Sequence, residues 1–318
     1  MKRFKSILLV CEEETLDEVL VARAVWLAKA NGAKITLVDV VEAAPGELAR
    51  LFGGQSGGRE QDVEHEVLES FQRRLSALAK PIRDAGVETD EVVLQGVGFI
   101  EIVRQVLRGG HDLIMKRAGG RQEGRSVFFA STDLHLMRKC PCPVWIMNPS
   151  PKPRYRRILA AVDPDPQDPQ RHALNRMILD LATSLSQADE SELQVVHAWR
   201  LEEEDTLRHS AFARVPKDRV AALIEEKRQE SEGRLQTLLG SYPDLKIGEQ
   251  VQMLHGQARS VIPELAETLE VELIVMGTLG RTGVRGLIIG NTAESILNQV
   301  HCAVLAVKPP GFETPIEA

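Results

Sequence analysis

The chain has 318 residues, of which 43% are hydrophobic and 27% charged, a composition typical of a soluble globular protein. At roughly 150 residues per domain, this length suggests two domains. The net charge of -7 and the 4% of aromatic residues argue against a nucleic-acid-coating or membrane-surface protein. No hydrophobic run is long enough to cross a bilayer or to act as a secretory leader. Four cysteines do not make a disulfide framework, so we expect a cytoplasmic protein.

The first half begins with a short hydrophobic run at 7–10, which is typical of a strand buried on both faces. Three helices and a last strand are then expected near 62–84, 99–108, 131–138 and 144–147. The glycine-containing segment 42–61 is interpreted as a flexible surface loop rather than a lid. Cys140 and Cys142 stand before prolines, and we interpret them as small buried side chains rather than metal ligands.

The second half repeats this pattern, starting with a hydrophobic strand at 158–162. Asp168 followed by Pro169 predicts a helix start, because aspartate caps a helix and proline suits its first position. Further strands are expected at 193–198, 246–254, 273–276 and 303–307. Further helices are expected at 218–239, 260–268 and 291–299. Residues 199–217 are interpreted as a surface loop, and 309–318 as a poorly ordered polar tail.

The two halves are related by an internal repeat. A constant offset of 160 positions aligns residues 95–120 with 255–280, and an offset of 151 aligns 7–10 with 158–161. This period is far longer than the 20–50 residues of a solenoid repeat, so the repeat indicates a duplicated domain. The expected domains are 1–150 and 151–318.

The alternation of strands and helices predicts an α/β fold in which each half is a doubly wound parallel sheet of five strands. In such sheets, ligands bind outside the carboxyl ends of the strands, where the strand order reverses. The residues that follow the strands are therefore the candidates for a binding site.

A glycine-rich segment carries the strongest site signal. Five glycines fall between Gly277 and Gly290, after an expected strand and before an expected helix. Glycines let main-chain N–H groups approach an anion, and Arg281 and Arg285 add positive charge. The segment is neither a Walker A motif nor the fingerprint that follows the first strand of a dinucleotide-binding fold.

The spacing Gly277-x2-Gly280-x9-Gly290 resembles the ATP-binding branch of the universal stress protein family. The run 156–163, which ends on Asp163, is similar to that family's first strand. The resemblance covers the whole chain as two tandem copies. It implies the universal stress protein fold, which is also called adenine nucleotide alpha hydrolase-like.

The resemblance also implies a site for ATP or another adenine nucleotide, with Mg²⁺ bound through the nucleotide. Asp163 is implied to bond the ribose, and Ala198 to meet the adenine through its main chain. The implied binding residues are Asp163, Ala198, Met276, Gly277, Gly280, Gly290, Asn291 and Thr292. Asn291 stands where the family usually has serine or threonine, although its amide can still donate a hydrogen bond.

Residues 111–113, 132–133, 136–141 and 143–145, together with 290–294 of the second half, are similar to the tandem E-type branch of the family. The first half nevertheless departs further from the family's nucleotide-binding pattern. By the repeat offsets, Arg117 replaces Gly277, Ala130 replaces Gly290 and Glu12 replaces Asp163. We therefore expect no ATP in the family manner at residues 117–130. Lys116 and Arg117 are left with two interpretations, namely that they hold a different anion or that they are simply solvated.

The last strand of each half, at 144–147 and 304–307, is hydrophobic, and in this family the equivalent strand pairs two domains about a two-fold axis. The resemblance therefore implies an intramolecular pseudo-dimer, with a homodimer of the whole chain left open.

The leading functional hypothesis is a cytoplasmic stress-response sensor or adaptor that binds an adenine nucleotide in its second half and hydrolyses it slowly or not at all. Alternatives are a protein that binds a hydrophobic, acyl-type small molecule, a nucleotide-free adaptor for protein partners, and, weakest, a true hydrolase of this fold. His197 and His255 are interpreted as structural, and we assign no catalytic residue or metal ligand.

Overall fold

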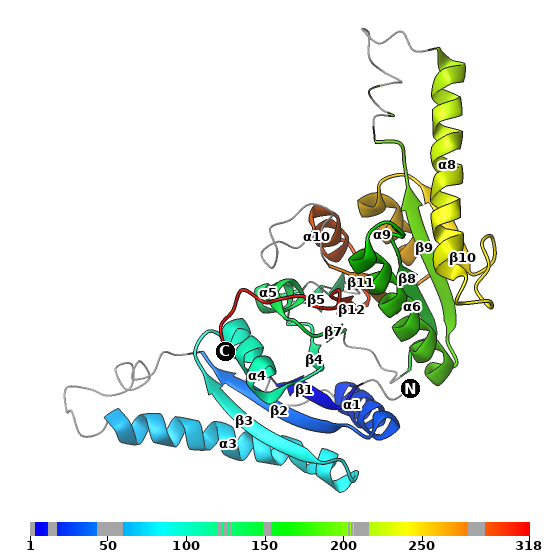
Figure 1. Cartoon of the computed structure of the whole chain (residues 1–318). Helices are drawn as coiled ribbons and strands as arrows, with labels where there is room; N and C mark the ends of the chain where they lie inside the picture. Colours follow the sequence, from blue (N-terminus) through cyan, green and yellow to red (C-terminus); the bar gives the residue numbers. More distant parts are fainter. Residues whose placement is uncertain are drawn as a thin grey trace.

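A computed structural model describes residues 4–11, 18–42, 60–119, 122–123, 126–127, 129–148, 154–202, 204, 206, 216–278 and 290–318. Its centre is one ten-stranded sheet with the order β10-β9-β8-β11-β12-β7-β4-β1-β2-β3. Five consecutive positions of that order belong to each half of the chain (Figure 1). The expected pair of doubly wound five-stranded sheets is confirmed, and the two sheets join edge to edge.

The first half follows the expected order of elements. It comprises β1 (Ser6–Val10), α1 (Glu18–Asn31), β2 (Lys34–Val41), α3 (Glu60–Asp84), β3 (Thr89–Gln95), α4 (Gly98–Gly109), β4 (Leu113–Arg117), α5 (Ser131–Lys139) and β7 (Val144–Met147). A two-stranded ribbon of β5 (Gln122–Glu123) and β6 (Ser126–Val127) lies between β4 and α5 in the chain. All five residues of β1 are buried, as expected for a strand covered on both faces. Cys140 and Cys142 are buried, as expected.

The second half repeats this order without the ribbon among its described residues. It comprises β8 (Arg157–Ala161), α6 (Pro169–Asp189), β9 (Glu192–Trp199), α8 (Lys217–Leu239), β10 (Val251–His255), α9 (Ala258–Thr268), β11 (Leu273–Gly277), α10 (Asn291–Leu297) and β12 (Ala303–Val307). The Asp168 carboxylate accepts hydrogen bonds from the main-chain N–H groups of Gln170 and Arg171, so the predicted helix cap is confirmed. Within each half the strands of the ten-stranded sheet pair in parallel.

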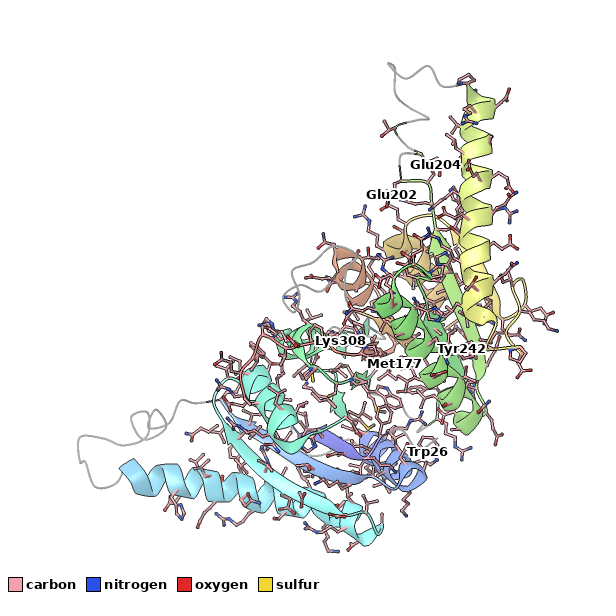
Figure 2. The ribbon with its side chains drawn as sticks, viewed as in Figure 1. Trp26, Met177, Glu202, Glu204, Tyr242 and Lys308 are labelled. Carbon is pink, nitrogen blue, oxygen red and sulfur yellow. The ribbon has the colours of Figure 1, made fainter. Side chains whose placement is uncertain are left out.

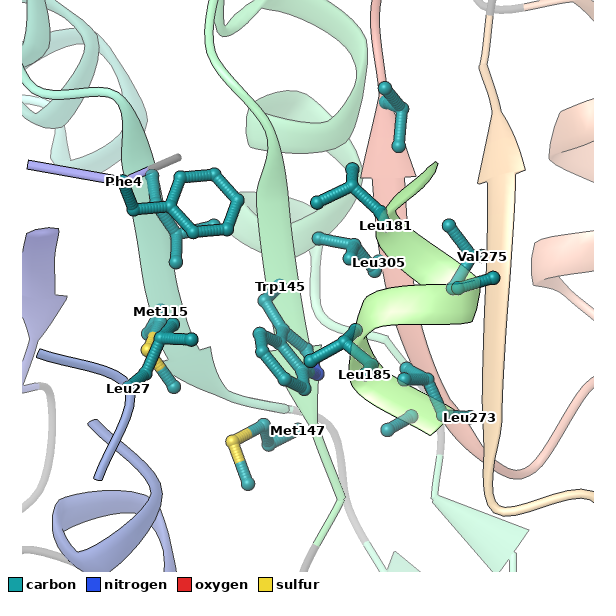
Figure 3. Packing of buried hydrophobic residues seen from close by; sticks show 14 of the residues in the cluster. Phe4, Leu27, Met115, Trp145, Met147, Leu181, Leu185, Leu273, Val275 and Leu305 are labelled. Carbon is teal, nitrogen blue, oxygen red and sulfur yellow. The ribbon is translucent and has the colours of Figure 1, made fainter. Parts of the chain in front are cut away.

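The halves meet through their fifth strands, β7 and β12, which pair antiparallel. Trp145 lies opposite Leu305 in this ladder, and these two residues are equivalent at the repeat offset of 160. Two equivalent residues that face each other place a pseudo-two-fold axis at that point, because such an interface is self-complementary. Figure 3 shows Trp145 among side chains from both halves, beside Leu305 and Leu185.

The two faces of the sheet are covered by different sets of helices. α1, α3, α6 and α8 pack on one hydrophobic cluster, and α4, α5, α9 and α10 pack on the other. Each cluster contains buried residues from both halves, such as Leu37 and Leu273 in the first and Ile114 and Ile274 in the second. Equivalent helices of the two halves thus cover the same face, so the pseudo-two-fold axis is perpendicular to the sheet. Each hydrophobic core continues from one half into the other.

Two expectations were wrong. The strand expected at 246–254 begins only at Val251, because residues 246–250 form a turn in which the Gly248 N–H donates to Val251 O. The tail expected to be disordered instead lies against the first half, where Arg104 Nε donates to Glu317 O at 3.1 Å. Ile316 packs against the second hydrophobic cluster, so buried hydrophobic surface holds the tail in place. Most of 42–61 and 199–217 lies outside the described residues, and no described helix is long and hydrophobic enough to span a membrane.

Candidate functional site

The candidate site lies at the carboxyl ends of β8 and β11, the central strands of the second half's sheet. β8 pairs with β9 on one side and with β11 on the other, so the strand order reverses between β8 and β11. Met276 of β11 lies opposite Ala161 of β8, which brings Gly277 and Asp163 to the same end of the sheet. Open α/β sheets bind their ligands at this position of the strand order.

Asp163 is held by its main chain while its carboxylate is left accessible. The Asn175 side chain accepts from Asp163 N at 2.8 Å and donates to Asp163 O at 2.9 Å. Asn175 is buried in α6, whereas the Asp163 side chain is 46% exposed. A fixed main chain with an exposed carboxylate is suited to accepting hydrogen bonds from hydroxyl groups of a ligand.

Arg171 is the cation nearest to Asp163 in this group. Its guanidinium lies 3.2 Å from Asp165, 3.6 Å from Asp168 and 3.9 Å from Asp163. The arginine is therefore shared among three carboxylates and is bound most closely by Asp165. It offers no uncommitted charge for a developing phosphate transition state.

Gly277 has a packing role that the sequence did not reveal. A Cβ atom at this position would lie 2.8 Å from Cδ2 of Leu174, on α6. The glycine therefore lets α6 approach the end of β11, whatever else binds there. A glycine at position 277 is therefore weaker evidence for a phosphate site than the glycine spacing of this segment suggested.

The predicted site residues in and around the glycine-rich segment divide into three groups. Met276 and Gly290 are buried, and the Gly290 N–H donates to Thr278 O at 3.0 Å. Asn291 and Thr292 are exposed at the start of α10. Gly280 lies outside the described residues. The structure thus brings the ribose-type and helix-start positions to one end of the sheet, while most of the loop itself is not described.

The end of β9 presents a mixed surface next to β8. Ala198 is partly exposed there, beside His197, whose Nδ1 lies 3.2 Å from Val162 O. His197 is buried, so its interpretation as a structural histidine is supported. His255, at the end of β10, lies 2.8 Å from Glu204 Oε2 and against the Trp199 ring. Figure 2 shows Glu202 and Glu204 just beyond the end of β9.

The equivalent position in the first half holds a buried ion pair. Lys116 Nζ of β4 lies 2.7 Å from Asp133 Oδ1 of α5, and both side chains are almost wholly inaccessible. Asp133 Oδ2 also accepts from the N–H groups of Gly119 and Ala130, each at 2.9 Å. Sequence reasoning considered an anion beside Lys116 but missed that the chain supplies it. The signal was a lysine within an otherwise buried strand.

A second buried lysine joins the two halves. Lys308, just after β12, donates to Met137 O of α5 and to Thr278 Oγ1 after β11. Thr278 Oγ1 also donates to Met137 O at 3.0 Å. Burial lowers the pKa of Lys308 to about 7, and the nearby thiols of Cys140 and Cys142 offset part of that effect. Figure 2 shows Lys308 between the halves.

Fold and site together define a tandem α/β protein whose candidate site lies where the strand order of the second half reverses. The model of the Universal stress protein family matches residues 3–148 and 154–308. The chain therefore belongs to the universal stress protein family, with two copies of its domain in tandem.

Known proteins of the same tandem length are similar to the chain. Universal stress protein E of Escherichia coli K12 is 29% identical over 331 aligned residues, which cover 100% of this chain and 98% of that protein. A universal stress protein E homolog from Haemophilus influenzae is 25% identical over 96% of the chain and 98% of its own length. A crystal structure of a universal stress protein from Pseudomonas aeruginosa matches 97% of this chain and 94% of its own, with a TM-score of 0.71 and 22% identity. The resemblance to the tandem E-type branch is thereby confirmed.

Proposed function

We propose that the chain is a cytoplasmic stress-response protein that binds one adenine nucleotide, ATP or a relative, in its second half. The observation that carries the proposal is the exposed carboxylate of Asp163 at the point where the strand order reverses. Asn175 fixes the main chain of this aspartate. A crystal structure is known of another universal stress protein in complex with cAMP. The four free, buried cysteines fit a reducing compartment.

The residues at the site suit parts of a nucleotide unequally. Asp163 suits ribose hydroxyls, and Ala198, which is partly exposed near the end of β9, would meet the adenine. The phosphates would meet residues 277–292, where Asn291 and Thr292 are exposed. The Gly290 N–H is already used by Thr278 O, so a phosphate would have to displace that bond. Mg²⁺ would arrive with the nucleotide phosphates, as it usually does, rather than in a cage of protein ligands.

We further propose that the bound nucleotide acts as a signal and is hydrolysed slowly or not at all. The support is the commitment of Arg171 to Asp165 and Asp168, which leaves it unsuited to stabilising a transferring phosphate. Two other occupants stay as test outcomes: a hydrophobic, acyl-type molecule and a protein partner without nucleotide.

Native mass spectrometry of the freshly purified protein tests the proposal. We expect a mass increase of one adenine nucleotide per chain after incubation with ATP, and an at least tenfold weaker occupancy in Asp163→Ala. Asp244→Ala is the matched control, because Asp244 is exposed in the turn before β10, away from β8 and β11. An acyl-type adduct, or equal ATP occupancy in the two variants, would contradict the proposal.

A further inference from the structure

The Lys116–Asp133 pair lies where the first half repeats the candidate site of the second. Lys116 pairs with Val10 of β1 and Ile146 of β7. At the offset of 160, its counterpart is Met276, which pairs with the matching strands of the second half at Ala161 and Ala306. The counterpart of Asp133 is Ala293.

The Asp133 carboxylate is surrounded as a bound anion would be. One oxygen accepts from two main-chain N–H groups at 2.9 Å, and the other lies 2.7 Å from the Lys116 ammonium. The exposed fractions of the Lys116 and Asp133 side chains are 1% and 0%. Two amides and a cation around one oxyanion make the donor set that loops of this kind use for phosphates and carboxylates.

The contacts of this carboxylate reach beyond the helix on which it lies. The Ala130 N–H lies at the start of α5, and a side chain three residues on commonly caps that donor. The Gly119 N–H, however, comes from the residues that leave β4. The carboxylate therefore bridges the two ends of the loop that connects β4 to α5. Lys116 Nζ also donates to Arg117 O at 2.9 Å.

The second half has no matching charge pair at the equivalent positions. Met276 and Ala293 are both buried and hydrophobic there. The Gly290 N–H, the counterpart of that of Ala130, donates to a main-chain oxygen instead of a carboxylate. The two halves thus share a backbone plan and differ in whether the chain supplies an anion of its own.

We propose that Asp133 is an internal anion, with Lys116 as its counter-ion, that fills the first half's anion site and closes it to external oxyanions. The comparison with a ligand site in the second half rests on the proposed function. The internal anion itself does not, because it is argued from the contacts in the first half.

Removing the carboxylate tests this proposal by chemical rescue. Asp133→Ala leaves two main-chain donors and the Lys116 ammonium around a space of the size of a carboxylate, and sodium formate is the probe. We expect Asp133→Ala to melt below the wild type, and formate to raise its Tm by about 2–4 °C, saturably, relative to sodium chloride of equal ionic strength. The wild type should show no such difference between the two salts.

The matched control is Lys116→Met/Asp133→Ala, which lacks both charges and should not respond to formate beyond chloride. If Asp133→Ala is too unstable to melt, the same comparison is made on its refolding yield from urea. Equal formate responses in the single and double variants, or none in either, would overturn the proposal. Neither reading involves ATP, so a failure here is distinct from a failure of nucleotide binding in the second half.

Discussion

At the residue scale, the chain places ionisable groups where water cannot reach them and then compensates each differently. Lys116 is neutralised by a carboxylate, whereas the acceptors of Lys308 among the described residues are neutral, namely Met137 O and Thr278 Oγ1. An isolated charge in such a place is costly, and a lysine there responds by losing its proton near neutral pH. Lys308 is therefore expected to couple the stability of the protein to pH.

We predict that the stability of the wild type, measured relative to Lys308→Met, rises with pH between about 7 and 10. The folded pKa of Lys308 is about 7 and its ordinary value is 10.5, so unfolding in this window takes up a proton. Stability then increases by up to about 1.4 kcal/mol per pH unit. The thiols of Cys140 and Cys142 lie near the amine and are present in both proteins, so their contribution largely cancels in the difference.

Urea unfolding of the two proteins at pH 7, 8 and 9 checks this prediction. Parallel curves of unfolding free energy against pH would show that Lys308 is charged in the folded protein.

At the scale of elements, α1 of the first half and α6 of the second are joined by a buried ion pair. Arg23 donates to the Asp189 carboxylate through its two terminal guanidinium nitrogens, Nη1 and Nη2, at 2.5 and 2.7 Å, and both side chains are 1% exposed. The guanidinium also lies about 5 Å from the rings of Trp26, Trp145 and Tyr155. The pair thus adds a specific contact to the β7–β12 ladder on one face of the sheet.

We predict that Arg23→Met lowers the free energy of unfolding by about 3–5 kcal/mol, because it leaves the Asp189 carboxylate buried and uncompensated. Asp189→Leu should cost a similar amount, and the double variant should cost clearly less than the sum of the two. Urea unfolding of all four proteins measures this coupling. Additive effects, or single effects below 1 kcal/mol, would contradict it.

The elements also show what the sequence allows one to predict. Hydrophobic runs and helix signals located the strands and helices closely, because the buried strands are hydrophobic along their whole length and Asp168 is a local cap. The tail was misjudged because its anchor is a distant partner, Arg104, which no local pattern reveals. The same holds for Lys116 with Asp133 and for Leu174 over Gly277, since each depends on packing between separate elements.

At the scale of the whole molecule, the duplication uses up the association edge of each half. β7 and β12 pair with each other, so a homodimer of the chain would have to use another surface than its fifth strands. Figure 1 shows the two halves as one continuous sheet, with α3 and α8 extending outward. The domains 1–150 and 151–318 are therefore proposed as two units of sequence that fold into one body.

We predict that the halves stay together after the chain is cut between them. A protease site is inserted at residues 149–153, which stand between β7 and β8 in the sequence, and the purified protein is cleaved there. The β7–β12 ladder, the Arg23–Asp189 pair and the Thr278–Met137 bond should hold the fragments together. Gel filtration should then show one peak at the size of the uncut chain. Two separate peaks would argue against a single body.

Whether only the second half binds a nucleotide can be measured by a calorimetric titration of the intact chain with ATP, with and without Mg²⁺. We predict a stoichiometry of one nucleotide per chain, because Asp133 fills the equivalent place in the first half. A stoichiometry of two would contradict the closure of the first half. No binding at all would contradict the proposed function and make the glycine loop an inherited scaffold.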